Sequence, residues 1–428
     1  MSLINDIPEL VKANVISEET AEKIRLYYQE KKVDSQTKLF VIFAVLGAIL
    51  VGLGIILILA HNWDELSRKT KTFFAFLPLV VGQVLCGYSL LKKRDDIAWK
   101  ESTTVFLFFA VGASISLVGQ IYNIEGNLSR FLLAWMLLCF PLIYVMNSSI
   151  GSLLYIAGIT YYACETGLWS YPKTEPYFYW ILLLISFPHY YQLYKNKPQS
   201  NFIIFHHWLI PLSVMICLGT ITKGKEELMF VAYFGLFGLY YLIGNSTVFK
   251  NQESRNNSYL NLGSLGTIIL LLMLSFDWFW NKLKDKNFQL NELIFTPEFV
   301  ALAVLTFAAG IVFYFQKRNQ KMLEIKPIEV VFVLFIIIFI IGLEYPHLSI
   351  ILINLVVLTI GILTIIQGAK LDHLGILNYG LLIITTLVIC RFFDTDLSFI
   401  ARGFLFISVG VGFFLTNYYL LKKRKKNE

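Results

Sequence analysis

Long uninterrupted apolar runs are the feature that most restricts what this sequence can fold into. The first three cover residues 39–60, 72–91 and 103–122, and each has at least the roughly 20 residues that a helix needs to cross a bilayer. Backbone amides inside lipid must be hydrogen-bonded within the structure, which leaves helices or closed barrels. Because these runs do not alternate apolar with polar residues, they predict helices.

The composition of the whole chain agrees with this class. Of its 428 residues, 57% are hydrophobic and 15% are charged, and the mean hydropathy is +0.64. Soluble domains carry about 25% charged residues, so we predict an all-α, polytopic transmembrane helical bundle. About 14 spans are expected, within a range of 12–14 because the pairs 131–164 and 328–366 have almost no linker between spans. The spans are 39–60, 72–91, 103–122, 131–146, 148–164, 177–195, 202–222, 226–244, 259–280, 295–316, 328–345, 348–366, 373–391 and 398–421.

Polar segments flank the bundle at both ends of the chain. Residues 1–38 are expected to form a short cytoplasmic helical hairpin, with Ser17 as the N-cap of its second helix and acidic residues in the first turn. Residues 39–421 form the bundle, and residues 422–428 are a basic cytoplasmic tail. Each apolar pair without a linker is either one tight hairpin or a re-entrant segment.

The positive charges predict a membrane orientation and do not indicate nucleic-acid binding. The chain has a net charge of +7, and its Lys and Arg residues lie at the ends of the spans. With the amino terminus inside, these residues favour the inner segments by about two to one, which is the expected sense of the positive-inside rule. Both termini are therefore expected in the cytoplasm, with membrane lipids as contacts.

Neither the cysteines nor the histidines indicate a metal site, and the sequence predicts no cofactor. All five cysteines fall within apolar runs and form no CxxC pair, so they are expected to pack as small residues. The histidines have no HExxH or similar ligand spacing.

Polar residues at the ends of several spans are expected to meet at the outer face. Spans one, three and thirteen all run outward, and ionisable groups at span ends are expected to pair or to reach the interface. The candidate outward pocket comprises His61, Asn62, Trp63, Asp64, Gln120, Tyr122, Asn123, Arg391, Asp394 and Arg402. It is expected to bind a small polar or anionic solute or a lipid headgroup. The alternative is that these residues only cap helices, contact headgroups and form ion pairs.

A second candidate is the pair Pro188 and His189 inside the span 177–195. Proline removes a backbone hydrogen bond and frees carbonyl groups that neighbouring helices or water must satisfy. Broken helices near the midplane are common in transporters, and here a titratable group adjoins the proline. Such prolines also occur in helical bundles of every function.

Three sequence features resemble the family known as domain of unknown function 2157. They are Val15-Ile16-Ser17-Glu18-Glu19 with Ala21 and Ile24, the Gly-rich first span that closes on Asn62-Trp63, and Val118-Gly119-Gln120-Ile121-Tyr122-Asn123. The resemblance covers about residues 8–165, and Arg391-Phe392-Phe393-Asp394 with Arg402 is similar to the end of such proteins. His61 departs from the small residue expected there. The resemblance implies a polytopic bacterial membrane protein, which we expect in the cytoplasmic membrane, and supplies no activity or catalytic residues.

Three functions are compatible with these sequence patterns. The patterns favour a protein that is not an enzyme. The first is a transporter not driven by ATP, or a lipid-handling protein, with the outward pocket as its site. The second is a non-catalytic scaffold that recruits a protein partner through residues 1–35. The third is an integral-membrane enzyme acting on a lipid or glycan, which requires His61 beside Asp64 to act as a base.

Overall fold

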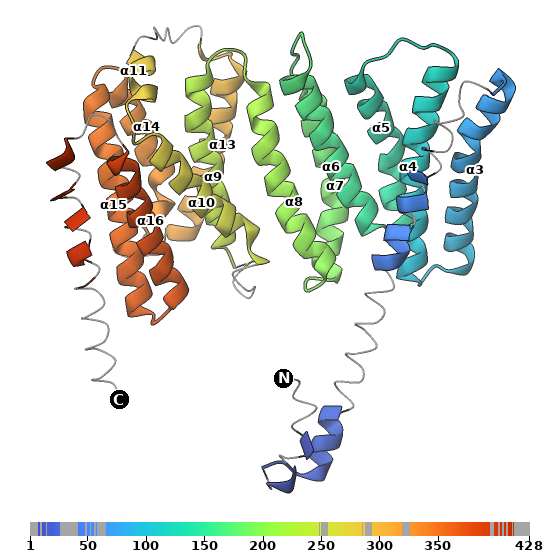
Figure 1. The fold of residues 1–428 in the computed structure, drawn as a ribbon, viewed down its shortest axis with the longest axis horizontal. Helices are drawn as coiled ribbons and strands as arrows, with labels where there is room; N and C mark the ends of the chain where they lie inside the picture. The colour runs from blue at the N-terminus through green and yellow to red at the C-terminus, as the bar shows by residue number, and fades with distance from the viewer. Residues whose placement is uncertain are drawn as a thin grey trace. The chain divides into compact units, whose positions relative to one another are not determined.

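The protein is a helical membrane protein in which the chain forms two compact units. The computed structural model describes residues 66–247, 256–284, 293–318 and 326–393, with residues 249 and 286 and short stretches within 7–57 and 398–414 (Figure 1). All regular secondary structure in these ranges is helical, which confirms the predicted fold class. Unit 1 is Met1–His206 and unit 2 is His207–Glu428, and we describe each by itself.

Unit 1 contains consecutive helices that run in alternating directions (Figure 1). They are α3 Arg68–Lys92, α4 Ile97–Ile121, α5 Leu128–Met146, α6 Ser149–Cys164 and α7 Tyr177–Asn196, followed by α8 Asn201–Leu218, which crosses the unit boundary. A polar side chain caps the start of each of the first four by accepting a hydrogen bond from a backbone N–H; these caps are Ser67, Asp96, Asn127 and Ser148. Short polar linkers therefore define where each apolar helix begins.

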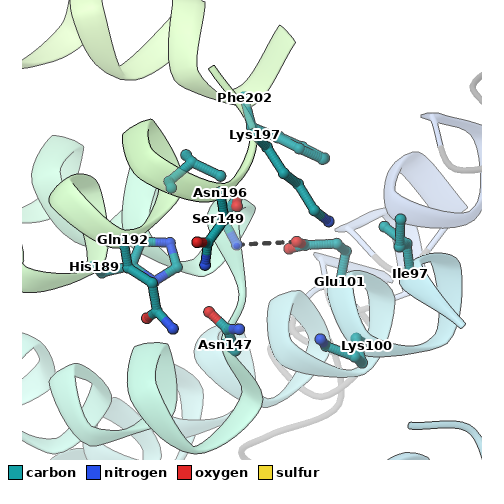
Figure 2. Close-up of a pocket in the computed structure, with 11 residues that line it drawn as sticks. Ile97, Lys100, Glu101, Asn147, Ser149, His189, Gln192, Asn196, Lys197 and Phe202 are labelled. Atoms are coloured by element: carbon teal, nitrogen blue, oxygen red, sulfur yellow. Dashed lines mark hydrogen bonds between the residues drawn. The ribbon is translucent and has the colours of Figure 1, made fainter. Parts of the chain in front are cut away.

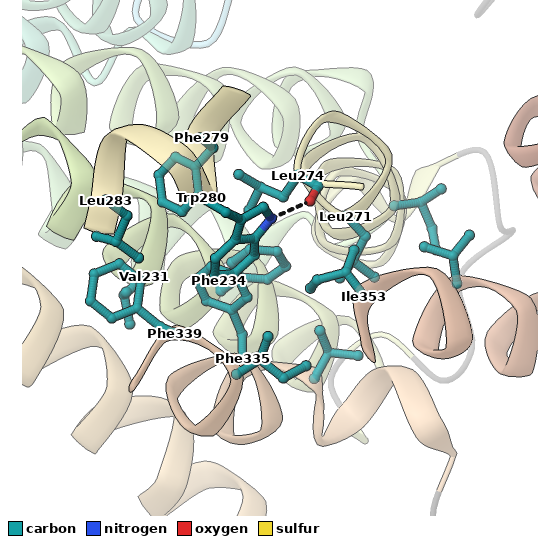
Figure 3. Packing of buried hydrophobic residues seen from close by; sticks show 14 of the residues in the cluster. Val231, Phe234, Leu271, Leu274, Phe279, Trp280, Leu283, Phe335, Phe339 and Ile353 are labelled. Atoms are coloured by element: carbon teal, nitrogen blue, oxygen red, sulfur yellow. Dashed lines mark hydrogen bonds between the residues drawn. The ribbon is translucent and has the colours of Figure 1, made fainter. Parts of the chain in front are cut away.

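The longer described helices of unit 2 follow α8 along the chain. They are α9 Glu226–Gly244, α10 Ser258–Met273, α11 Trp278–Lys284, α13 Pro297–Lys317, α14 Val331–Gly342, α15 Pro346–Lys370 and α16 Leu374–Phe392. Aromatic residues from α9, α11 and α14 form the centre of its core, where the rings of Phe234 and Phe335 stack with centroids 4.0 Å apart (Figure 3). Trp280 is fully buried beside them.

Eight helices in the described ranges are long and apolar enough to cross a membrane, or nine if a bent pair counts as one span. The expected spans between residues 72 and 391 fall on helices, but 259–280 is divided between α10 and α11, and α6 and α14 have only 16 and 12 residues. Most of the first and last expected spans lies outside the described residues. The number of about 14 spans therefore stays a prediction.

The two apolar pairs without linkers are resolved as tight connections. Asn147 adopts the left-handed conformation, with φ of 47°, and ends α5 only two residues before α6 begins. Figure 1 shows α5 and α6 side by side, so residues 131–164 form a helical hairpin. Three residues separate α14 from α15, and these helices also pack together.

The predicted span 259–280 is not one continuous helix but a bent pair, either a broken span or a re-entrant segment. The helix stops at Met273, and α11 leaves at an angle of 72° to α10. Side chains bind the carbonyl groups that this break frees: the indole nitrogen of Trp280 donates to the Leu274 oxygen at 2.7 Å, and the amide of Asn354 donates to the Ser275 oxygen at 3.2 Å. An apolar sequence alone does not reveal a break that distant side chains stabilise.

The described part of residues 1–38 is helical at 18–25 and at short stretches before Ala13. Ser17 accepts a hydrogen bond from the Thr20 backbone N–H at 3.2 Å, as expected for an N-cap. Ile7 and Ala21 are both buried.

Candidate functional site

The ends of five helices enclose a small polar pocket at one edge of unit 1, which we call the polar inlet (Figure 2). It lies where α4, α6 and α8 begin and where α5 and α7 end. Its volume is about 80 Å³, which accommodates several water molecules, since one water occupies about 10–15 Å³ on this measure. Its polar lining consists of Lys100, Glu101, Asn147, Ser149, His189, Gln192, Asn196 and Lys197.

Glu101 forms the buried wall of the polar inlet and caps a neighbouring helix. Its carboxylate accepts hydrogen bonds from the backbone N–H groups of Ser149 and Ile150, each at 2.9 Å, and from the hydroxyl of Ser148. These donors belong to the first turn of α6, whose N–H groups have no partner within the helix. A carboxylate is favoured there because the helix dipole is positive at its amino terminus. The negative charge of Glu101 is thus compensated by α6.

His189 lies opposite Glu101, and its ring faces the polar inlet (Figure 2). The residue is 2% exposed, and its Nε2 atom has no hydrogen-bond partner among the described residues. Buried polar atoms in proteins normally have a partner, so this nitrogen is an unused donor or acceptor in a residue that lines the inlet.

A second histidine lies behind His189, with 6.0 Å between the ring centroids. The Nδ1 atom of His206 is 2.7 Å from the Phe202 carbonyl oxygen, which can only accept, so Nδ1 carries the proton. Its Nε2 atom is 3.0 Å from the Ser152 hydroxyl. Unlike His189, His206 has both ring nitrogens engaged.

Pro188 lies inside α7, where hydroxyl groups bind the carbonyl oxygens that precede it. The Tyr155 hydroxyl donates to the Leu182 oxygen at 3.3 Å, and the Tyr144 hydroxyl donates to the Ile185 oxygen. Both tyrosines come from neighbouring helices, α6 and α5. The carbonyl that loses its helical donor at Pro188 is that of Leu184, four residues earlier, so these two bonds join α7 to its neighbours on either side of that position.

A larger groove occupies the opposite end of α4, and we call it the amphipathic groove. It has a volume of about 1140 Å³ and runs between α3, α4 and α5. One end is polar and is lined by Gln120, Asn123, Glu125, Asn127 and Arg130. The rest is mainly apolar and is lined by residues such as Phe76, Leu79, Val111, Ile115, Phe131 and Leu138.

Gln83 is a polar exception within the apolar part of the amphipathic groove. It lies 15 residues after the start of α3, or about 22 Å along the helix axis, and its side chain is exposed. An amide at the depth of the hydrocarbon core is costly unless it meets water or a polar group. Sequence reasoning did not single out Gln83, although it is an isolated amide within the run 72–91.

The structure brings together two of the ten residues of the predicted outward pocket, Gln120 and Asn123, at the polar end of the amphipathic groove. Tyr122 instead contacts α3. The guanidinium of Arg68 lies 5.2 Å from the centroid of the Tyr122 ring, and the Thr72 hydroxyl lies 3.3 Å from the Tyr122 hydroxyl. Tyr122 therefore joins two helices.

The described residues of unit 1 do not test the rest of that predicted pocket. Arg391 belongs to unit 2, where it donates to the Ser275 hydroxyl at 3.0 Å and lies 4.5 Å from the Phe276 ring centroid. His61, Asn62, Trp63, Asp64, Asp394 and Arg402 lie outside the described residues. A single pocket formed by all ten stays a prediction.

Sequence reasoning missed most of the polar inlet. It selected His189 for its neighbouring proline but not Glu101, Lys100 or Lys197. The available signal was the acidic residue Glu101 just before the apolar run 103–122, where lipid disfavours a charge without a partner.

The family model described as "Predicted membrane protein (DUF2157)" matches residues 8–152 of this chain, which confirms the resemblance over that range. The match covers α3 to α5 and the Glu101 cap of α6, and it ends before α7. No curated protein and no solved structure matches the chain.

Proposed function

We propose that this membrane protein handles lipids and binds one amphiphilic molecule in the amphipathic groove of unit 1. The observation that carries the proposal is the distribution of polarity along the groove, with a polar end at Gln120, Asn123 and Arg130 and a long apolar remainder. An amphiphile presents the same division between headgroup and hydrocarbon chain. The binding energy would come mainly from burying the chain, at about 25 cal/mol per Å² of apolar surface.

The size of the groove supports a ligand larger than a simple solute. Its volume of about 1140 Å³ exceeds the range of about 300–1,000 Å³ that is typical of small-molecule pockets. Exposed Arg130 and the amides of Asn123 and Gln120 offer hydrogen-bond donors for a phosphate or hydroxyl-rich headgroup. Gln83 adds a polar contact deeper in the groove, which suits a ligand with an ester or hydroxyl group near its headgroup.

The proposed orientation places the polar end of the groove at the outer face of a bacterial cytoplasmic membrane. It rests on the bias of Lys and Arg toward the opposite segments, which would put both termini in the cytoplasm. The lipid would then enter from, or leave to, the outer leaflet.

A pair of bulky substitutions tests the proposal. Ser116→Trp fills the groove, because Ser116 is exposed on its α4 wall, whereas Val84→Trp adds the same side chain at an exposed position of α3 outside the groove lining. After purification in detergent and extensive washing, the wild-type chain and Val84→Trp should retain about one lipid per chain by mass spectrometry. Ser116→Trp should retain several-fold less. Equal retention by both variants would refute the proposal.

Truncation separates lipid handling from the scaffold hypothesis. If residues 1–35 only recruit a protein partner, their deletion abolishes the cellular phenotype and leaves lipid retention unchanged. If the groove is the functional site, Ser116→Trp abolishes the phenotype while the amino-terminal segment stays intact. Ile7 and Ala21 are buried, so substituting either could disturb the folding of this segment. Deleting the whole segment is therefore the clearer test.

A further inference from the structure

We propose that the polar inlet binds a small oxyanion of the phosphate class, held between Lys100, Lys197 and His189. This site lies at the opposite end of α4 from the amphipathic groove: Glu101 and Gln120 are 19 residues apart, which corresponds to about 28 Å along a helix. The proposal does not depend on lipid binding in the groove.

The balance of charge in the polar inlet favours an anion. Two lysines line it against one carboxylate, Glu101, and that carboxylate already accepts three hydrogen bonds from the start of α6. Among the described residues neither Lys100 nor Lys197 forms an ion pair within 4.0 Å. Figure 2 shows the Lys197 side chain directed into the inlet, toward Glu101. A bound anion would give both ammonium groups a partner.

The buried ring of His189 supplies the observation that points to a ligand. His189 lines the inlet, and its Nε2 atom is buried and has no hydrogen-bond partner in the described part of the chain. Leaving such an atom unpaired costs about 1–3 kcal/mol, so a ligand oxygen at this point would be stabilising. The Nε2–H group of His189 would donate a hydrogen bond to this ligand oxygen. His206 cannot do so, because both of its ring nitrogens already have partners.

The size and the mouth of the inlet limit the ligand further. A volume of about 80 Å³ suits a single phosphate-sized group and excludes a nucleotide or an acyl chain. The amides of Asn147, Gln192 and Asn196 are exposed at the mouth and can donate to the outer oxygens. Both free phosphate and the phosphate group of a lipid headgroup could enter through this mouth. The headgroup is an option because the inlet lies at the ends of apolar helices, where lipid headgroups are found.

The test uses the full-length protein, purified in a phosphate-free detergent and washed free of lipid. Inorganic phosphate is added in one arm and phosphatidic acid in mixed micelles in the other, each against sodium chloride at equal ionic strength. At near-saturating ligand the thermal unfolding midpoint should rise by about 2–4 °C or more, because a ligand that binds only the folded state stabilises it. Binding of radiolabelled phosphate, or of labelled phosphatidic acid, gives the affinity directly.

Matched variants distinguish a site from a general salt effect. Lys100→Gln and Lys197→Gln should each weaken binding by about tenfold, because each removes a charge-assisted hydrogen bond. Lys93→Gln removes an exposed charge at the end of α3, outside the inlet lining, and should leave binding unchanged. His189→Gln keeps a donor near the position of Nε2 and should bind more tightly than His189→Leu.

Each outcome decides the proposal. Stabilisation by inorganic phosphate identifies a free anion as ligand, and stabilisation by phosphatidic acid alone identifies a lipid headgroup. The proposal is overturned if neither ligand raises the midpoint above the chloride control, or if the Lys100→Gln/Lys197→Gln double variant, shown to be folded, binds as the wild type does. Ser116→Trp should lose retained lipid but keep phosphate binding, because the groove and the inlet lie at opposite ends of α4.

Discussion

At the scale of single residues, Glu101 shows how a buried carboxylate is accommodated where a membrane helix begins. It is 3% exposed, and three donors from the start of α6 surround it. The same residue links two helices, α4 and α6, and forms one wall of the polar inlet. A single side chain thus serves both the packing of the bundle and the geometry of the candidate site.

Glu101→Gln should destabilise the folded protein by about 2 kcal/mol, because the amide cannot accept all three hydrogen bonds and presents its own N–H groups to the α6 donors. The unfolding free energy in detergent measures this loss. Asp95→Asn, at an exposed position of the α3–α4 linker, is the control and should change it by less than about 0.5 kcal/mol. Equal stability of the two variants would show that the cap contributes little.

At the scale of helices, close contacts between small and aromatic residues determine which helices lie together. A Cβ atom added at Gly112 of α4 would lie 2.5 Å from the Trp135 ring of α5, whose indole nitrogen donates to the Phe108 oxygen at 2.8 Å. In unit 2, a Cβ atom at Gly263 of α10 would lie 2.4 Å from the Tyr241 backbone nitrogen of α9. Because lipid provides no hydrophobic force between helices, such close packing stabilises the bundle.

Gly112→Ala should therefore lower the unfolding free energy by about 1–3 kcal/mol through overpacking against Trp135. Gly87 of α3 is the matched control, because an added Cβ there meets nothing within 4 Å. Gly87→Ala should be neutral or raise stability by up to about 1 kcal/mol through helix propensity. If both substitutions were neutral in thermal unfolding, the packing of α4 on α5 would have to be looser than described.

The break between α10 and α11 provides a second prediction at this scale. Trp280→Phe removes the indole donor from the Leu274 oxygen and should cost about 1–3 kcal/mol, since that carbonyl would lose its partner in a buried site. Trp278, two residues earlier, is 48% exposed. Trp278→Phe should leave the unfolding transition nearly unchanged, so the difference between the variants measures the hydrogen bond together with the packing of the buried ring.

At the scale of the whole molecule, the alternating helices of unit 1 separate its two candidate sites. The polar inlet is formed where α4 begins, and the amphipathic groove has its polar end where α4 ends. The span of α4 is 25 residues, or about 37 Å, which exceeds the hydrocarbon thickness of about 30 Å. The two sites should therefore face different compartments.

Thiol labelling in intact cells tests this arrangement after the five native cysteines are replaced by alanine. Asn123→Cys should react with an impermeant reagent added outside, and Asn196→Cys should react only after permeabilisation. Glu125→Cys and Lys93→Cys report on the same two edges and should behave like Asn123→Cys and Asn196→Cys, respectively. Labelling of Asn123→Cys and Asn196→Cys from the same side would contradict the assignment of α4 as a membrane span.

The helical class, and the positions of most helices between residues 72 and 391, could be predicted from the amino-acid sequence alone. Both depend on local properties: an apolar run must satisfy its own backbone hydrogen bonds in lipid, and polar residues such as Ser67 and Asn127 cap the helices that follow them. The sequence also identified Gln120 and Asn123, because an amide at the end of a Gly-rich helix stands out from its apolar neighbours.

Which polar groups share a site, and where an apolar run breaks, depends on how the helices pack in three dimensions. Glu101 and His189 are 88 positions apart in the sequence, and only the packing of α4, α6 and α7 places both in one inlet. Likewise, residues 259–280 are continuous in hydropathy, but Trp280 and Asn354 bind the carbonyl groups of the break. The physical reason is that apolar helices have nearly equivalent faces in lipid, so their partners are selected by contacts between residues far apart in the chain.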